Sequence, residues 1–149
     1  MFKTRLTGRA MVPALAILLL LPLAGSALAE SGLYKIDAEL FENDELTASP
    51  MMIVEQDKPG RVVVGDTAFE MMVADEGERD GRPVIRLTAE VKRLHNDGSS
   101  RSGERTLIAP VLILDDSSEP ADQPATVSVA DITLTARVQR VTPSEVAGR

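Results

Sequence analysis

Apolar and polar residues alternate with a period of two along most of the chain after Gly32. Successive side chains of a β-strand point to opposite faces, so this alternation is typical of strands with one face in a core and the other in water. The clearest case is the segment Val84 to Leu94, in which Ile85, Leu87, Ala89 and Val91 alternate with Arg86, Thr88, Glu90 and Lys92. We predict a half-buried strand there.

Other segments have the same character, and together they give about eight strands. Ile36 to Leu40 and Ile132 to Val138 alternate as clearly as the first segment. Shorter runs rich in apolar and β-branched residues occur at Met51 to Glu55, Arg61 to Val64, Ala68 to Val73, Thr106 to Leu114 and Thr126 to Val129. No segment combines a helical stripe of apolar residues with helix caps, so the sequence predicts an all-β chain.

Residues that favour tight turns separate the predicted strands. Gly65-Asp66, Asp80-Gly81 and Asp97-Gly98 are examples. The last two supply the positive φ angles that two-residue hairpins require. Short connections lead neighbouring strands to pair antiparallel. Because a single sheet would leave one apolar face in water, we expect an antiparallel β-sandwich of about eight strands.

Two parts of the chain look alike. When Asp57 to Val73 is laid without gaps on Asp122 to Val138, six positions carry identical residues: Asp57 and Asp122, Pro59 and Pro124, Val62 and Val127, Val64 and Val129, Asp66 and Asp131, Val73 and Val138. A proline followed by an apolar strand precedes each copy. Convergent patterning of two hairpins is one explanation. The other is a structural repeat, in which each half supplies strand, turn, strand, turn and strand, and the halves pack face to face.

The first 29 residues have the composition of a secretory signal peptide. The basic residues Lys3, Arg5 and Arg9 precede an unbroken apolar run from Ala14 to Leu21. Small residues at positions 27 and 29 predict cleavage between Ala29 and Glu30. A retained membrane anchor is the alternative, but a proline, a glycine and a serine interrupt the run, which falls short of the roughly 20 apolar residues of a span.

Cleavage would leave one domain with a strong negative charge. The full chain has 16 basic and 23 acidic residues, a formal charge of −7, and loss of the three basic residues of the signal peptide takes this charge to −10. Such a charge disfavours nucleic acid and anionic lipid headgroups as partners. We expect a single β-sandwich domain over residues 30–143, a disordered tail over 144–149, and no stable membrane insertion after cleavage.

Cysteine is absent and aromatic residues are few. The lack of cysteine excludes disulfides, thiol chemistry and cysteine-based metal sites. Tyr34, Phe41 and Phe69 are the aromatic residues that remain after cleavage. They are too few for a carbohydrate-binding platform or for stacking single-stranded nucleic acid. We expect no cofactor.

His95 is the single histidine, so any nucleophilic catalysis with a histidine base would have to use it. The segment Asn96 to Ser100 follows it and is rich in glycine and serine. A flexible hairpin tip is poorly suited to holding nucleophile and base rigidly together. A surface position at a strand end is the simpler interpretation, and we predict that the protein is not an enzyme.

Acidic residues cluster in three predicted loops, near Asp44, at Asp75 to Asp80 and from Asp115 to Asp122. None of the three matches the calcium-loop pattern of alternating acidic residues around a glycine. Solvated hairpin loops explain the clusters, and a weak divalent-cation site at Asp75 to Asp80 is the alternative.

Met51, Met52, Met71 and Met72 are unusual residues for strands. Neighbouring strand residues point to opposite faces, so one methionine of each pair is expected in the core and the other near the surface. An exposed methionine offers an adaptable apolar contact to a partner protein, and a thioether can also bind Cu(I). The four methionines are therefore candidate partner contacts.

The segment from Ala48 to Asp66 reads ASPMMIVEQDKPGRVVVGD, a proline-led strand followed by a polar turn, a small residue, an alternating strand and a glycine. This order resembles a signature in the β-domain of bacterial secretins and in short exported proteins that share it. The resemblance covers Ala48 to Val91 and is repeated over Ala109 to Val138. It implies a β-domain of the cell envelope and transfers no catalytic residue. The chain lacks the ring-forming domains and pore strands of secretins, so pore formation is not expected.

Export, the lack of a catalytic constellation and the secretin-like pattern predict a non-enzymatic periplasmic accessory protein, linked to secretion. We expect it to bind another envelope protein through an edge strand or through the methionine-bearing face. The alternative is a periplasmic binder of a small molecule or of a metal ion, Cu(I) or Ca²⁺.

Overall fold

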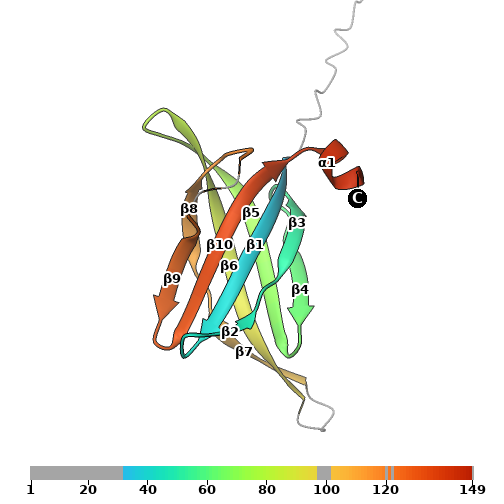
Figure 1. Ribbon diagram of the computed structural model, residues 1–149, viewed down its shortest axis with the longest axis vertical. Coiled ribbons are helices and arrows are strands. Elements are labelled where there is room, and N and C mark those ends of the chain that lie inside the picture. Colours follow the sequence, from blue (N-terminus) through green and yellow to red (C-terminus); the bar gives the residue numbers. More distant parts are fainter. Residues whose placement is uncertain (1–31, 97–101, 120, 122, 149) are drawn as a thin grey trace, which may run out of the picture.

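The structure is a computed structural model that describes residues 32–96, 102–119, 121 and 123–148. The predicted signal peptide, with its cleavage site between Ala29 and Glu30, lies outside these residues, as do the predicted turn at Asp97-Gly98 and Asp122 of the repeat. The described residues form ten strands and one helix (Figure 1): β1 (Leu33–Glu42), β2 (Glu45–Ala48), β3 (Met51–Glu55), β4 (Gly60–Val64), β5 (Thr67–Arg79), β6 (Arg82–Asn96), β7 (Ser102–Ile108), β8 (Val111–Asp115), β9 (Ala125–Val129), β10 (Ile132–Val141) and α1 (Pro143–Ala147).

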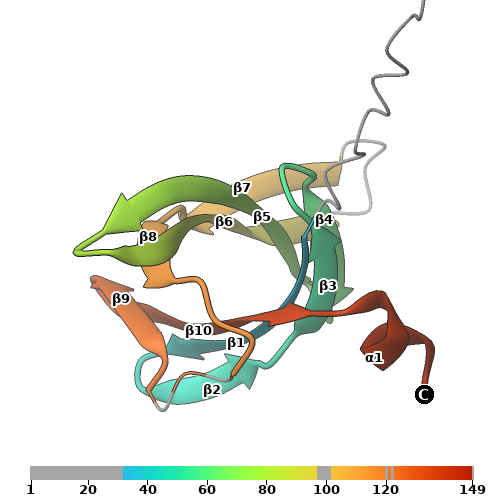
Figure 2. The same ribbon diagram turned by 90° about the horizontal axis from the view of Figure 1, so that it is seen from above.

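Two five-stranded antiparallel sheets pack face to face (Figure 2). The first sheet has the order β2-β1-β10-β9, and β3 pairs with the same edge of β1 as β2 does. The second has the order β4-β5-β6-β7, and β8 pairs with the same edge of β6 as β7 does. The predicted antiparallel β-sandwich is confirmed.

The two strands beyond the predicted eight arise next to prolines. β2 and β3 follow one another along β1, and β7 and β8 follow one another along β6. Pro50 and Pro110 lie at the breaks, and their carbonyls accept hydrogen bonds of 3.0 Å from the amides of Ala38 and Ala89. Proline has no amide hydrogen to donate in return, so each ladder is interrupted there. The predicted strand Thr106 to Leu114 is therefore two strands.

The inward-facing residues of both sheets form one core. In β6 the four apolar residues of the predicted inward face are at most 1% exposed, as their alternation predicts. Phe69 on β5 and Leu134 on β10 are fully buried from opposite sheets. The core also contains Tyr34, Ile36, Ala38, Leu40, Ala48, Val54, Met71, Val73, Ile108, Ile132, Ala136 and Val138.

The two halves of the described chain have the same fold. Strands β1 to β5 correspond in order to β6 to β10, and equivalent strands pair in the same register. Val62 faces Phe69 in the β4–β5 hairpin, and Val127 faces Leu134 in the β9–β10 hairpin. The structure thus confirms the internal repeat that the sequence suggests.

The way the halves assemble differs from the expectation that they pack as separate layers. Each half gives its first three strands to one sheet and its last hairpin to the other sheet. The reason is the tight turn between the halves. Asp80 and Gly81 have φ angles of 53° and 76°, which are the angles of a two-residue hairpin, so β5 must pair with β6.

The two corners of the sandwich differ in how closely they are packed. A short turn, residues 56–59, connects β3 to β4, and these strands lie against each other. A Cβ atom on Gly60 would lie 2.5 Å from Val54 Cγ1, so the close approach depends on glycine. The loop 116–124 connects β8 to β9 on the opposite side (Figure 2), where Ala125 occupies the position equivalent to Gly60.

A short helix occupies much of the segment for which the sequence analysis predicts a disordered tail. Pro143 is its first residue, and the Glu145 carboxylate accepts a 2.6 Å hydrogen bond from the amide of Thr142. This bond lowers the pKa of Glu145. The prediction overlooked the capping signal of a threonine followed three residues later by glutamate. No helix in the described residues is long and apolar enough to cross a membrane.

Candidate functional site

The four methionines do not form a common surface. Met71 is 1% exposed and lies in the core, where it has no access to a partner. Met52 is partly buried and packs against the core, and Met72 is partly buried on the opposite face of β5 from Met71. Met51 is 54% exposed on the outer side of β3. Of the predicted contacts, Met51 is therefore the one that is open to a partner in this structure.

Some of the acidic and histidine residues singled out from the sequence approach one another, since Glu42 and His95 line one pocket. In the described residues no group of three or more His, Asp or Glu side chains is placed to hold a metal ion. Within the predicted Asp75 to Asp80 cluster, Asp75 accepts a 2.7 Å hydrogen bond from the Gly77 amide, and Glu76 lies 3.4 Å from Arg86. His95 is exposed on β6. The serines predicted near it, Ser99 and Ser100, lie outside the described residues.

Among the strands that the structure describes, β8 pairs with β6 alone, and its other edge is here called the free edge. In an antiparallel ladder, alternate residues direct both backbone groups toward the partner strand. The amide of Asp116 donates to Pro83 at 2.9 Å, and the carbonyl of Pro110 accepts from Ala89, so the even-numbered residues face β6. Val111, Ile113 and Asp115 therefore direct their amides and carbonyls away from the sheet.

This edge is also apolar. Val111 is 58% exposed and Ile113 is 40% exposed. The edge strands β4 and β9 also expose apolar residues, Val63 and Val129, but they carry the polar residues Arg61 and Ser128 beside them. Charges on an edge strand discourage pairing with another chain, and β8 lacks this protection along its apolar part.

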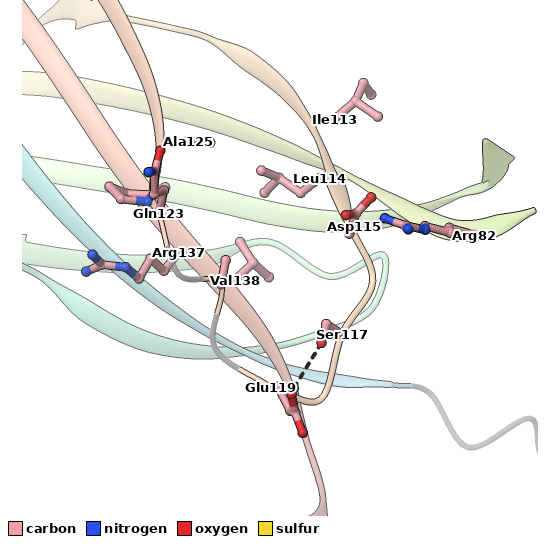
Figure 3. Close-up of a pocket in the computed structure, with 13 residues that line it drawn as sticks. Arg82, Ile113, Leu114, Asp115, Ser117, Glu119, Gln123, Ala125, Arg137 and Val138 are labelled. Carbon is pink, nitrogen blue, oxygen red and sulfur yellow. Dashed lines mark hydrogen bonds between the residues drawn. The ribbon is translucent and has the colours of Figure 1, made fainter. Parts of the chain in front are cut away.

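A cleft of about 760 Å³ opens between β8 and β9 (Figure 3). Leu114 of β8 and Val138 of β10 point toward the space between the strands, and Ile113 of β8 also lines the cleft. Ala121, Pro124, Ala125 and Ala136 are further apolar residues of the lining. The charged residues of the lining are Arg82, Asp115, Glu119 and Arg137. A cleft with both apolar and charged lining residues thus lies directly beside the free backbone groups of β8.

A polar cluster holds the loop after β8 against the other sheet. Arg140 on β10 pairs with Asp116 through two nitrogens, and its Nε donates to Asp116 Oδ1 at 3.1 Å. Arg140 Nη2 also donates to the Tyr34 hydroxyl at 3.0 Å, and its amide donates to Ser117 at 2.8 Å. Burial raises the pKa of Tyr34, Asp116 adds to this shift, and Arg140 opposes it. The cluster fixes one end of the cleft.

The outer face of the second sheet carries a row of alternating charges. Arg61 pairs with Glu70, and its Nη2 lies 2.7 Å from Glu104. Lys92 Nζ lies 3.4 Å from Glu70 and 3.2 Å from Glu90. Hydrogen bonds from Arg61 lower the pKa values of both Glu70 and Glu104.

Acid is expected to destabilise the protein through this row. The pKa values of Glu70 and Glu104 are lower in the folded state than the ordinary value of 4.5. Their contribution to the free energy of unfolding is therefore complete above the pKa of the unfolded state. It is lost as the pH falls through the pKa of the folded state. Thermal unfolding measured between about pH 3 and about pH 7 should show a falling melting temperature below about pH 4.5. In Arg61→Gln the fall should be shallower, and an unchanged slope would contradict this assignment.

The sequence analysis did not single out Val111, Ile113 or Ala136. The run Val111 to Leu114 is apolar at every position, so it shows no alternation from which an exposed face can be recognised. The proline before it was the available signal, because proline favours strand edges. For Ala136 the available signal was the alignment of the two similar segments, in which Ala136 matches Met71.

No protein-family model, no curated protein and no solved structure matches the chain. The resemblance to the secretin β-domain over Ala48 to Val91 therefore stays a prediction.

Proposed function

We propose that this protein is a non-enzymatic accessory module of the bacterial envelope that binds another polypeptide by pairing an extended segment with the free edge of β8. The observation that carries the proposal is the combination, at one place, of unpaired backbone groups, exposed apolar side chains and a cleft. Strand addition uses these features, because backbone hydrogen bonds supply affinity and alternate side chains enter adjacent pockets.

The edge of β8 suits an incoming strand better than its counterpart in the repeat. Ile53 on β3 is equivalent to Ile113 and is 46% exposed. However, β4 lies against β3 at Gly60, where a single added Cβ would contact Val54 at 2.5 Å. At the other corner the cleft leaves room for side chains on the inner face of an added strand. β3 and β8 therefore expose similar apolar side chains, but the room for an added strand is beside β8.

The envelope location follows from the predicted signal peptide. A module cleaved between Ala29 and Glu30 would meet polypeptides on the far side of the inner membrane, where assembly systems use strand addition. The secretin-like pattern over Ala48 to Val91 favours a role linked to secretion. The formal charge of the full chain is −7, which favours neutral or basic partners over acidic ones.

A charge placed on the free edge is expected to weaken partner capture. Ile113→Lys puts a lysine where an incoming strand would pair, and edge lysines oppose such pairing. Capture of envelope proteins by the mature chain, tagged after Arg149, should fall by about tenfold or more, which corresponds to about 1.4 kcal/mol of binding free energy. Because Ile113 is 40% exposed, the melting temperature should change little.

Ile53→Lys is the matched control, because it makes the same change at the equivalent position of the other half. Capture should persist in this variant. If Ile53→Lys loses the same partners as Ile113→Lys, or if neither variant loses any, the β8 edge is not the binding site.

A further inference from the structure

We infer that a pocket at the end of the sandwich away from α1 binds a free amino acid with an apolar side chain. This inference goes beyond the proposed function, because it concerns a small ligand and a place other than the β8 edge. The pocket has a volume of about 530 Å³, and residues of the β6–β7 hairpin, the end of β1 and the β9–β10 turn line it. These elements lie at the same end of the molecule (Figure 1).

Two arginines of the pocket, Arg93 on β6 and Arg105 on β7, lie directly opposite each other in the sheet. Like charges in such a pair destabilise a sheet when nothing offsets them. The charge of Arg93 is offset by its ion pairs with Glu42 and Asp66. Arg105 forms no ion pair among the described residues. Its guanidinium can therefore take its counter-charge from a ligand.

The repeat shows that the shared fold does not require this basic pair. β2 pairs with β1 in the same register as β7 pairs with β6, and both pairings contain a register shift at the equivalent place. The residues equivalent to Arg93 and Arg105 are Glu42 and Glu45. The first half thus has two acids where the second half has two arginines, so the arginines are particular to this pocket.

His95 and Asp131 are two further polar residues of the lining. His95 lies two residues beyond Arg93 and so on the same face of β6. Asp131 lies in the β9–β10 turn, and its equivalent in the first half, Asp66, pairs with Arg93. Within the described ranges neither His95 nor Asp131 forms an ion pair. The pocket therefore presents both a basic group and an acidic group to a ligand.

A free amino acid matches this combination of groups. Its carboxylate can accept hydrogen bonds from Arg105 and from the imidazole of His95, and its ammonium can pair with Asp131. Leu107 is partly buried and Val129 is 57% exposed, and both line the pocket, where they offer apolar surface to the ligand's side chain. A simple carboxylate would leave Asp131 without a partner, and a simple amine would face Arg105, so a zwitterion is favoured.

Three ligands of similar shape test the inference. Leucine has both charged groups, 4-methylpentanoate lacks the amino group, and 3-methylbutylamine lacks the carboxylate. Calorimetric titration of the mature protein at neutral pH should show leucine binding about tenfold or more tightly than either analogue. Amide NMR shifts at Leu107, Ala130 and Ile132 should place leucine in the pocket.

Two substitutions assign the two ends of the ligand. Arg105→Gln removes the partner of the carboxylate and Asp131→Asn removes the partner of the ammonium, and each should weaken leucine binding about tenfold or more. Asp131→Asn should not weaken binding of 4-methylpentanoate, because this analogue has no ammonium. Glu45→Gln is the matched control at the position equivalent to Arg105, and it should keep the affinity for leucine. All three side chains are exposed, so the fold should tolerate each change.

Two results would overturn the inference. One is the absence of amide shifts in the pocket at leucine concentrations up to about 10 mM, which would mean that no useful affinity exists. The other is leucine binding that is no tighter than that of the analogues or that survives both substitutions, which would mean that the pocket does not recognise a zwitterion. Neither result bears on strand addition, because the pocket and the cleft beside β8 share no lining residue.

Discussion

Replacing Phe69 with alanine is expected to lower the free energy of unfolding by about 3–5 kcal/mol. Phe69 is fully buried in the core between the two sheets. Its removal takes away a large apolar side chain and leaves a cavity that the surrounding strands fill only in part. Domains of this size have unfolding free energies of about 5–15 kcal/mol, so the variant is expected to lose a large share of its stability. Urea denaturation followed by circular dichroism measures the change.

Two controls accompany this prediction. Leu134→Ala removes the equivalent residue of the other half, which is also fully buried, and should cost about 2–5 kcal/mol. Phe41→Ala removes a phenylalanine from the outer, partly buried side of β1 and should cost about 1 kcal/mol. Equal costs for Phe69→Ala and Phe41→Ala would contradict the assignment of the core.

Adding one methyl group at Gly60 is expected to destabilise the protein by about 1–3 kcal/mol. The new Cβ would lie 2.5 Å from Cγ1 of Val54, which is 3% exposed and β-branched. A buried valine has little freedom to move aside, so β3 and β4 must separate. Urea denaturation of Gly60→Ala gives the cost.

A double-mutant cycle tests the cause of that cost. Val54→Ala removes the clashing methyl, so the double variant Gly60→Ala, Val54→Ala should be more stable than the sum of the single changes predicts. Ala125→Gly at the other corner should cost only about 0.5–1 kcal/mol, which is the general penalty for glycine in a strand. Strict additivity in the cycle would show that the two residues do not limit the approach of β3 and β4.

The alternation of apolar and polar residues predicted most of the strands because half-buried strands impose it. Val84 to Leu94 is the clearest example, and its four inward residues are buried as expected. The same reasoning failed at Thr106 to Leu114. A continuous apolar run does not show where a proline breaks the ladder, so one predicted strand is two.

The topology required more than pattern. The sequence showed that Asp57 to Val73 resembles Asp122 to Val138, but not that each half gives its last hairpin to the other sheet. That exchange depends on which strand β5 pairs with, and the two-residue turn at Asp80-Gly81 decides it. The turn therefore indicates which strand pairs with β5, and the alternation of apolar and polar residues does not.

The sequence predicted the type of contact surface but not its position in the fold. The sequence favoured an edge strand or the methionines as the contact surface, without naming β8. Adjacent residues of a strand face opposite ways, so the two methionines of each pair differ in burial. Met71 of the pair on β5 is buried, and Met51 of the pair on β3 is exposed. The free edge at Val111 and Ile113 depends on pairing partners far away in the chain, and such pairings are not visible in local sequence.

Site-specific photo-crosslinking in the producing bacterium tests the central claim most directly. A photoreactive residue is placed at Ile113 on β8 and, in a matched strain, at Ile53 on β3, and crosslinked peptides are identified by mass spectrometry. We predict that position 113 crosslinks reproducibly to an extended segment of one envelope protein, and that position 53 does not. Equal crosslinking at both positions, or crosslinking at position 53 alone, would contradict strand addition at the β8 edge.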